Sequence, residues 1–223
     1  MFLYKSSIIY IMNTNDNEYT YAFKIILLGD PDVGKSSFAS ILANDHFPTE
    51  HFSTIGVEFV TNIVQLENGK FVKLLLWDTA GQERYRSLTR SYYNNVIGCF
   101  IFFDLTKKET FNNVKYWLDQ ISEKINDKSG VIYLIGNKLD LVNKRRVSNE
   151  EIINLIENYK NIETLKYFEV SIRNNKNDAV NLFKKIGEEI YSKVKNNKIK
   201  EDVKRVNEIL PNEVKKNKCC FIS

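Results

Sequence analysis

The stretch Gly29-Asp30-Pro31-Asp32-Val33-Gly34-Lys35-Ser36 fits the pattern G-x-x-x-x-G-K-S/T. The apolar run Phe23–Leu28 stands directly before it, and Lys35–Ala43 reads as a helix behind it. A loop between a buried strand and a helix turns its backbone N–H groups inward, and the helix N-terminus adds partial positive charge. The sequence therefore predicts a phosphate-binding loop, with Lys35 on the β- and γ-phosphates of a nucleotide and the Ser36 hydroxyl on Mg²⁺.

Apolar runs of strand length alternate with segments of helical spacing along the rest of the chain. A hairpin turn signal at 67–70, Glu-Asn-Gly-Lys, separates two of the strand-like runs. We expect an α/β fold with a six-stranded, mostly parallel sheet, one antiparallel hairpin and helices on both faces. The expected strands are Phe23–Leu28, Val57–Leu66, Phe71–Trp77, Gly98–Phe103, Val131–Ile135 and Tyr167–Val170, and the expected helices are Lys35–Ala43, Lys108–Ile125, 148–159 and Asp178–Val194.

Composition describes a globular chain of 223 residues, of which 27% are charged and 43% hydrophobic. The longest apolar stretch, Val96–Phe103, is far shorter than a bilayer requires, so we expect no transmembrane helix. The net charge of +4 is concentrated in the segment Lys193–Lys218, which holds nine basic and four acidic residues. Nucleic-acid binding by the folded body is therefore not expected. Three cysteines do not make a disulfide framework, and Cys99 lies in an apolar run that indicates a core thiol.

The first 20 residues begin with an apolar stretch and end in polar sequence. A signal peptide is disfavoured because the apolar part is short and interrupted, and no A-x-A-like site follows. The alternatives are an N-terminal extension without fixed structure or a start at Met12. We expect an extension at 1–20, a nucleotide-binding domain at 21–194 and a flexible basic tail at 195–223.

Asn137-Lys138-Leu139-Asp140 follows the expected strand Val131–Ile135 directly. A carboxylate at Asp140 can accept hydrogen bonds from guanine N1–H and the exocyclic amine, a donor pair that adenine lacks. Asn137 can tie this loop to the phosphate loop, and the Lys138 stem can lie along the base. The carboxyl ends of α/β strands are where such sheets bind ligands. The pattern predicts guanine, and it disfavours the alternative of a P-loop kinase or ATPase, for which no lid-like insertion is present either.

Several motifs in order give the chain a close resemblance to the Ras-like small GTPases, and within them to the Rab family. Trp77-Asp78-Thr79-Ala80-Gly81-Gln82-Glu83-Arg84 matches the switch II signature, and Thr54-Ile55-Gly56-Val57-Glu58-Phe59 matches switch I. Tyr92-Tyr93 and the paired cysteines Cys219 and Cys220 fit as well. The resemblance covers about Tyr21–Val194 and, through the tail, residues to Ser223. It implies the P-loop GTPase fold, slow GTP hydrolysis and a switch that recruits effectors in intracellular vesicle trafficking.

The resemblance also implies roles for individual residues. Thr54 would ligate Mg²⁺, Asp78 would hold it through a water, and the Gly81 N–H would touch the γ-phosphate. Gln82 would orient the attacking water as the catalytic residue. Loss of the γ-phosphate would then release both loops. The nucleotide contacts implied are Asp32, Val33, Gly34, Lys35, Ser36, Ser37, Phe47, Thr54, Gly81, Asn137, Lys138, Asp140, Ser171, Ile172 and Arg173.

Some of these positions leave alternatives open. Phe47 would lie against the guanine, or it would be an ordinary loop anchor. Phe59, Trp77 and Tyr92 match the aromatic triad that Rab proteins present to effectors, although such a triad also serves packing between switch and sheet.

Two motifs depart from the usual family pattern. Pro31 lacks an N–H, and Asp32 places a carboxylate beside a polyphosphate, so we expect altered nucleotide exchange and a side chain that points outward. The second base-contacting motif is Ser171-Ile172-Arg173 where Ser-Ala-Lys is usual. The Ile172 backbone N–H would still bond guanine O6, and Arg173 would cover the base. A third hypothesis is a GTPase relative with failed catalysis, which the presence of Thr54, Asp78 and Gln82 disfavours.

The chain ends in Cys219-Cys220-Phe221-Ile222-Ser223, a C-a-a-X pattern with a second cysteine before it. The resemblance implies prenylation of both Cys219 and Cys220. Two lipid chains would anchor the protein stably to a membrane, whereas one chain gives only marginal binding. The resemblance further implies a guanine-nucleotide exchange factor, a GTPase-activating protein, a GDP-dissociation inhibitor and prenylation machinery as partners. The expected location is the cytoplasmic face of an intracellular membrane, with cycling through the cytosol.

Overall fold

The structure is a computed structural model that describes residues 19, 21–44, 47, 54, 56–81, 92–125, 130–196 and 220–222. For Asn196 and for 220–222 only the backbone is described.

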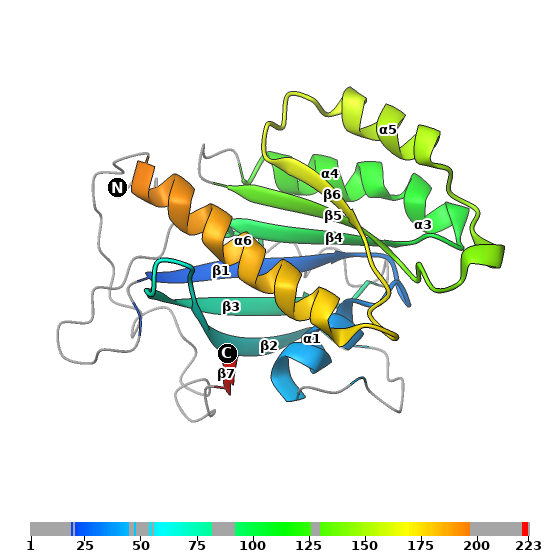
Figure 1. Ribbon diagram of the computed structural model, residues 1–223. Coiled ribbons are helices and arrows are strands. Elements are labelled where there is room, and N and C mark those ends of the chain that lie inside the picture. The colour runs from blue at the N-terminus through cyan, green and yellow to red at the C-terminus, as the bar shows by residue number, and fades with distance from the viewer. Residues whose placement is uncertain are drawn as a thin grey trace.

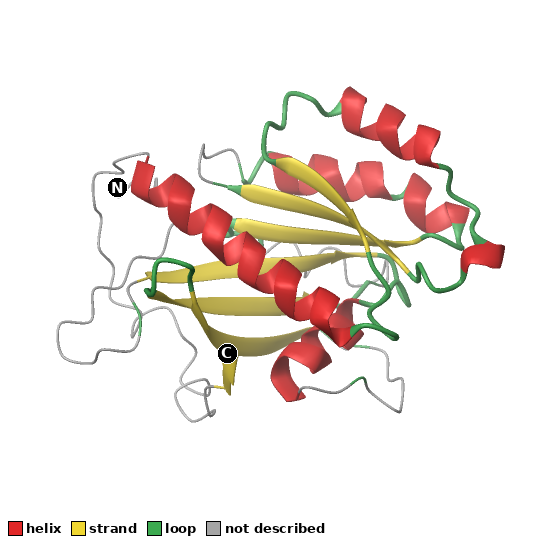
Figure 2. Cartoon of the chain, viewed as in Figure 1, coloured by secondary structure: helices red, strands yellow, loops and turns green. Residues whose placement is uncertain are grey.

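A mixed sheet forms the centre of the molecule, with strand order β6-β5-β4-β1-β3-β2-β7. All of its neighbouring strands run parallel except the antiparallel pair of β2 and β3. Figures 1 and 2 show this sheet as one twisted layer with helices packed on both sides. The strands are β1 (Tyr21–Gly29), β2 (Val57–Gln65), β3 (Phe71–Thr79), β4 (Gly98–Asp104), β5 (Val131–Asn137), β6 (Leu165–Glu169) and β7 (Cys220–Ile222).

The sheet separates the hydrophobic core into two layers, and helices cover each of them. Helices α1 (Lys35–Asn44) and α6 (Lys176–Asn196) pack with one face of the sheet, and α6 crosses that face diagonally in Figure 1. Helices α3 (Lys108–Asn112), α4 (Val114–Ser122) and α5 (Asn149–Asn158) pack with the opposite face. Every residue of β4 and β5 is buried, because both faces of a parallel strand are covered by helices.

The six strands expected from the sequence are all present, and the mostly parallel sheet with one antiparallel hairpin and helices on both faces is the expected arrangement. The hairpin joins β2 and β3, and the Leu66 N–H donates to the Lys70 carbonyl across its turn (2.7 Å). The start of α5 is the predicted capping box, in which the Glu151 N–H donates to Ser148 Oγ and the Ser148 N–H to the Glu151 carboxylate.

Two features differ from the expectation. The single helix expected at Lys108–Ile125 is two helices, α3 and α4, that meet at Asn113. A short seventh strand, β7, pairs in parallel with β2 through residues of the expected tail. Smaller differences concern boundaries: β5 continues through Asn137, and α6 begins at Lys176.

The topology gathers the predicted site at one edge of the sheet. β1 ends at Gly29, β3 at Thr79, β4 at Asp104, β5 at Asn137 and β6 at Glu169. Since all five of these strands are parallel to one another, the loops that follow them lie together at their carboxyl ends.

Candidate functional site

The phosphate loop lies between β1 and α1, as the sequence predicted. The ammonium of Lys35, the first residue of α1, is buried and donates to the carbonyl oxygens of Gly29 (2.9 Å) and Asp30 (2.7 Å). Burial lowers the pKa of Lys35 to about 8, against the opposing charges of Asp78, Asp30 and Asp32. A bound anion at this loop would offset the free-energy cost of burying that positive charge.

Gly34 shows how closely this loop approaches a second one. Its φ is +106°, and a Cβ built on it would lie 2.2 Å from Asn137 Nδ2. A larger residue would therefore push the two loops apart. Val33 and Ser37 on either side are buried as well.

Asn137, the last residue of β5, joins three loops through one side chain. Its Nδ2 donates to the Val33 carbonyl of the phosphate loop (2.9 Å). Its Oδ1 accepts from the backbone N–H of Ile172, in the loop after β6 (3.2 Å). Asn137 is 4% exposed, so these bonds are shielded from water. The tie between this loop and the phosphate loop, expected from the sequence, is confirmed.

The two loops expected to hold the base are bonded to each other. Ser171 Oγ donates to Asp140 Oδ1 (2.6 Å), and the Leu139 N–H donates to the Val170 carbonyl (3.1 Å). Ser171 therefore holds the Asp140 carboxylate in a fixed orientation. Lys138 adopts φ +68° and pairs with Asp104 at the end of β4 (Nζ–Oδ2 2.7 Å). Burial acts to raise the pKa of Asp104, but hydrogen bonds from Lys138 and Thr106 outweigh it and leave that pKa lowered.

The remaining predicted base contacts have mixed surroundings. Ile172 is 1% exposed, so its large side chain packs in the core. Its backbone N–H donates to Asn137 Oδ1. Arg173 is exposed at the rim of the site. Phe47 is half-buried against the α1–α6 core, which agrees with the loop-anchor interpretation; its contact with guanine stays a prediction.

Three oxygen-bearing side chains meet beside the phosphate loop. Ser36 Oγ and Thr54 Oγ1 lie 2.8 Å apart, and Asp78 is fully buried with no hydrogen bond to either carboxylate oxygen from the residues that the structure describes. Burial raises the pKa of Asp78 to about 6, although the Ser36 hydroxyl and Lys35 act against that rise. Hydroxyl and carboxylate oxygens are the ligands that Mg²⁺ prefers. An orphaned buried carboxylate next to two hydroxyls therefore fits a divalent cation.

Switch II enters the site at Gly81. A Cβ on Gly81 would lie 2.6 Å from Lys35 Nζ and from the backbone of Asp30 and Pro31, so only glycine allows this approach. Gln82, the predicted catalytic residue, lies outside the described residues. Asp32 is exposed with φ +61°, which agrees with the expectation that its carboxylate avoids the interior of the loop.

The predicted effector residues pack against one another. The rings of Phe59 and Trp77 meet edge to face with centroids 5.3 Å apart, and Tyr92 lies 5.4 Å from Trp77. Lys24 Nζ lies 4.3 Å from the centroid of the Trp77 ring. All three aromatic side chains are half-buried, so packing is confirmed and contact with effectors stays a prediction.

The structure adds residues that sequence reasoning missed. Asp30 is buried within the phosphate loop and accepts hydrogen bonds from Asn113 and Trp117, which are more than 80 positions away. Asp104 holds Lys138, and its place directly after an expected strand was a usable signal. No local pattern in the sequence pointed to Asn113.

Cys99 is the core thiol that the sequence analysis expected, whereas lipidation of Cys219 and Cys220 stays a prediction. Cys99 is a buried free thiol, and burial raises its pKa well above the usual range. Cys219 lies outside the described residues, and Cys220 is the first residue of β7. Within the described part of the chain, none of the helices has the length and apolar character needed to cross a bilayer.

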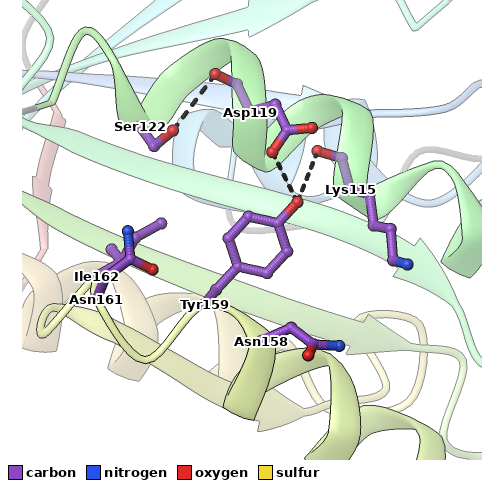
Figure 3. A pocket seen from close by; sticks show the side chains of 7 residues that line it. All are labelled: Lys115, Asp119, Ser122, Asn158, Tyr159, Asn161 and Ile162. Atoms are coloured by element: carbon purple, nitrogen blue, oxygen red, sulfur yellow. Dashed lines mark hydrogen bonds between the residues drawn. The ribbon is translucent and has the colours of Figure 1, made fainter.

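A polar pocket of about 430 Å³ lies elsewhere, between α4 and α5. Figure 3 shows Tyr159 at its centre, where the hydroxyl donates to Asp119 Oδ1 (2.7 Å). Its lining contains none of the predicted nucleotide contacts; the residues are Lys115, Asp119, Ser122, Asn158, Tyr159, Asn161 and Ile162.

Comparison with known proteins agrees with this geometry. The sequence model of the Ras family matches residues 24–192. Ras-related protein Rab2BV of Beta vulgaris is 44% identical over 182 residues, which cover 80% of each chain. Ras-related protein rab-11.1 of Caenorhabditis elegans is 40% identical over 191 residues, or 86% of this chain and 87% of that protein. Ras-related protein RGP2 of Oryza sativa subsp. japonica is 47% identical over 136 residues, or 61% of this chain and 62% of that protein.

The family match spans well over half of the chain and contains the phosphate loop, both base-side loops and the Ser36–Thr54–Asp78 group. The chain therefore belongs to the Ras family, as a Rab-like small GTPase that hydrolyses GTP and acts in vesicle trafficking.

Proposed function

We propose that this GTPase binds GTP or GDP with the phosphates over residues 29–36 and the guanine between residues 137–140 and 171–173. The observation that supports this most is the bridging position of Asn137. One buried amide bonds the phosphate loop and the loop after β6, and its own loop carries Asp140. A single nucleotide would then contact all three loops at once.

Asp140 is the residue that we propose selects guanine. Its carboxylate already accepts one hydrogen bond from Ser171 Oγ and retains capacity for the two guanine donors. Adenine would leave those acceptors unpaired in a desolvated site, which costs far more than a missing methylene group would. Lys138, held by Asp104, would lie along the base.

We further propose that Mg²⁺ binds at Ser36, Thr54 and Asp78, the last through a water. The ion would supply positive charge that offsets the charge developing on the phosphates during transfer. Lys35 holds the β- and γ-phosphates, and the Gly81 N–H contacts the γ-phosphate. Gln82 orients the attacking water, so hydrolysis is slow until an activating protein completes the site.

The cellular part of the proposal follows from family membership. An exchange factor loads GTP, a GTPase-activating protein ends the signal, and effectors bind at Phe59, Trp77 and Tyr92. Prenyl groups on Cys219 and Cys220 anchor the protein to the cytoplasmic face of an intracellular membrane. A GDP-dissociation inhibitor returns it to the cytosol. Residues 1–20 and 195–223 flank one GTPase domain as an extension and a basic tail.

The test is competition for bound fluorescent GDP, in wild type and in Asn137→Ala. In wild type, GDP and GTP displace the probe at similar concentrations, and ADP and ATP fail at about 1,000-fold higher ones. Asn137→Ala weakens GDP binding by about a hundredfold, because it breaks both loop contacts and leaves a buried N–H without a partner.

Asn62→Ala is the matched control. Asn62 is also a fully buried asparagine whose Nδ2 donates to a backbone carbonyl, that of Leu42 (2.8 Å), away from the site. It should leave GDP affinity near the wild-type value. Equal displacement by ATP, or equal losses in the two variants, would contradict the proposed site.

A further inference from the structure

The first half of the phosphate loop is tied to the helix pair α3–α4 by one carboxylate. Asp30 Oδ1 accepts a hydrogen bond from Trp117 Nε1 (3.0 Å), and Oδ2 accepts one from Asn113 Nδ2 (2.6 Å). Asp30 follows β1 directly, whereas Asn113 and Trp117 lie at the junction of α3 and α4 and one turn into α4. The contact therefore joins the phosphate loop to α3 and α4, which cover the face of the sheet opposite to α1.

Burial gives this contact its strength. Asp30 is 7% exposed and Trp117 is 1% exposed, so little water reaches the carboxylate. A buried carboxylate is costly unless donors satisfy it, and hydrogen bonds to an ionised acceptor are stronger than neutral ones. Both oxygens of Asp30 have such a donor. The side chain is thus held in one orientation, directed to the helix pair.

The backbone of Asp30 is fixed as well. Its carbonyl oxygen accepts from Lys35 Nζ (2.7 Å), and Gly81 approaches the peptide between Asp30 and Pro31. Asp30 thereby links Asn113 and Trp117, which bond its side chain, to Lys35, which bonds its backbone. We call the two side-chain bonds the Asp30 tether. The second half of the loop has its own support, since Gly34 rests on Asn137 and Val33 bonds to it.

We propose that Asn113 and Trp117 are positioning residues of the nucleotide site, which hold the first half of the phosphate loop in place for the β-phosphate through Asp30. They touch no nucleotide themselves. They also turn the Asp30 carboxylate toward the helices, so its negative charge is met by donors and not by phosphate. This inference rests on the proposed placement of the phosphates over residues 29–36.

The first experiment compares GDP with GMP, which lacks the β-phosphate, in wild type and Trp117→Phe. The phenyl ring keeps an aromatic side chain in the core and removes the Nε1–H donor. We expect GDP to dissociate about tenfold faster, the scale of one lost hydrogen bond to a charged group. GMP affinity, measured by competition, should stay unchanged. A general loss of packing would weaken both nucleotides alike, and that result would overturn the proposal.

The second experiment is a double-mutant cycle with Asp30→Ala. Asp30→Ala alone should also speed GDP release. Adding Trp117→Phe to Asp30→Ala should then have no further effect, because the donor has already lost its acceptor. Additive effects would show that Trp117 acts by another route and would overturn the inference.

Tyr159→Phe is the control, because it removes a different hydrogen bond to α4. Tyr159 follows α5, and its hydroxyl donates to Asp119 of α4 in the pocket of Figure 3. GDP release should match wild type. If wild type itself binds GMP as tightly as GDP, the placement of the phosphates fails, and that outcome is distinct from failure of the tether.

Discussion

At the residue scale, Asp32 is unfavourable to nucleotide binding in two ways: its backbone is strained, and its negative charge would repel a phosphate. It carries φ +61°, a conformation that costs a non-glycine residue about 1 kcal/mol or more. Its exposed carboxylate stands in a loop that would hold a polyphosphate. The neighbouring Pro31 fixes φ and supplies no N–H. The loop therefore carries two local disadvantages that the Asn137 and Asp30 contacts must outweigh.

We predict that Asp32→Gly slows GDP release several-fold, because glycine adopts positive φ freely and removes the repelling charge. Stopped-flow release of fluorescent GDP at low and high salt measures this. Asp32→Asn separates the two causes: it keeps the size and tolerates positive φ, so it should slow release only by the charge component, which shrinks at high salt. Equal rates for wild type and Asp32→Gly would contradict the prediction.

Single residues also mark how far sequence reasoning reached. The phosphate loop and Asn137–Asp140 were predictable because the chemistry of each is contained in a few adjacent residues. The tether of Asp30 was not, because its donors lie 83 and 87 positions away and no local pattern marks an acceptor for a tryptophan N–H. Phe47 illustrates the middle case, since spacing located it without deciding its role.

At the element scale, the loop that follows β5 is fastened to β6 by an ion pair. Arg145 Nη1 and Nη2 donate to the two carboxylate oxygens of Glu169 (2.7 and 2.6 Å), and Tyr167 donates to Glu169 as well. Arg145 Nε also donates to the Val147 carbonyl. Glu169 lies two residues before Ser171, and Arg145 lies five residues after Asp140, so the pair links the two base-side loops.

This pair gives a pH dependence with a definite sign. The Arg145 hydrogen bonds hold the pKa of Glu169 below its usual value. The pair therefore stabilises the fold above the unfolded pKa of about 4.3, and this contribution is lost as pH falls through the folded value. We predict that Arg145→Met lowers the free energy of unfolding by about 1 kcal/mol at pH 7, given partial exposure of both side chains.

Urea unfolding of wild type and Arg145→Met at pH 7 and below pH 4 measures this difference. The gap between the two proteins should close at the lower pH. Lys166→Met is the control, because Lys166 makes a single, more exposed contact with Glu189 and should cost less. A gap that persists or widens at low pH would rule out the ion pair as its source.

Elements were predicted well where their signals are local. The β2–β3 hairpin and the start of α5 follow from a turn sequence and a capping box. The break at Asn113 depends on tertiary surroundings, since nothing in the Lys108–Ile125 pattern interrupts a helix there. β7 was missed for a related reason: three residues that pair with an edge strand carry no periodic pattern of their own.

At the scale of the whole molecule, the two core layers support different halves of the phosphate loop. The α1–α6 layer supports Lys35 and the second half of the phosphate loop, and the α3–α5 layer reaches the first half through Asp30. The nucleotide site thus lies where both layers meet the carboxyl ends of the sheet. Overall architecture was predictable because alternating strands and helices allow few arrangements, whereas the tie between layers required the packed structure.

The central claim is that this site is a GTP-hydrolysing switch, and single-turnover hydrolysis tests it most directly. Wild-type protein loaded with GTP and Mg²⁺ should convert the bound nucleotide slowly to GDP. Gln82→Leu should slow that conversion by at least about tenfold, because the attacking water loses its orienting group. ATP should be neither retained nor cleaved. Bound GTP that stays intact in wild type, or ATP cleaved at the same rate, would contradict the account.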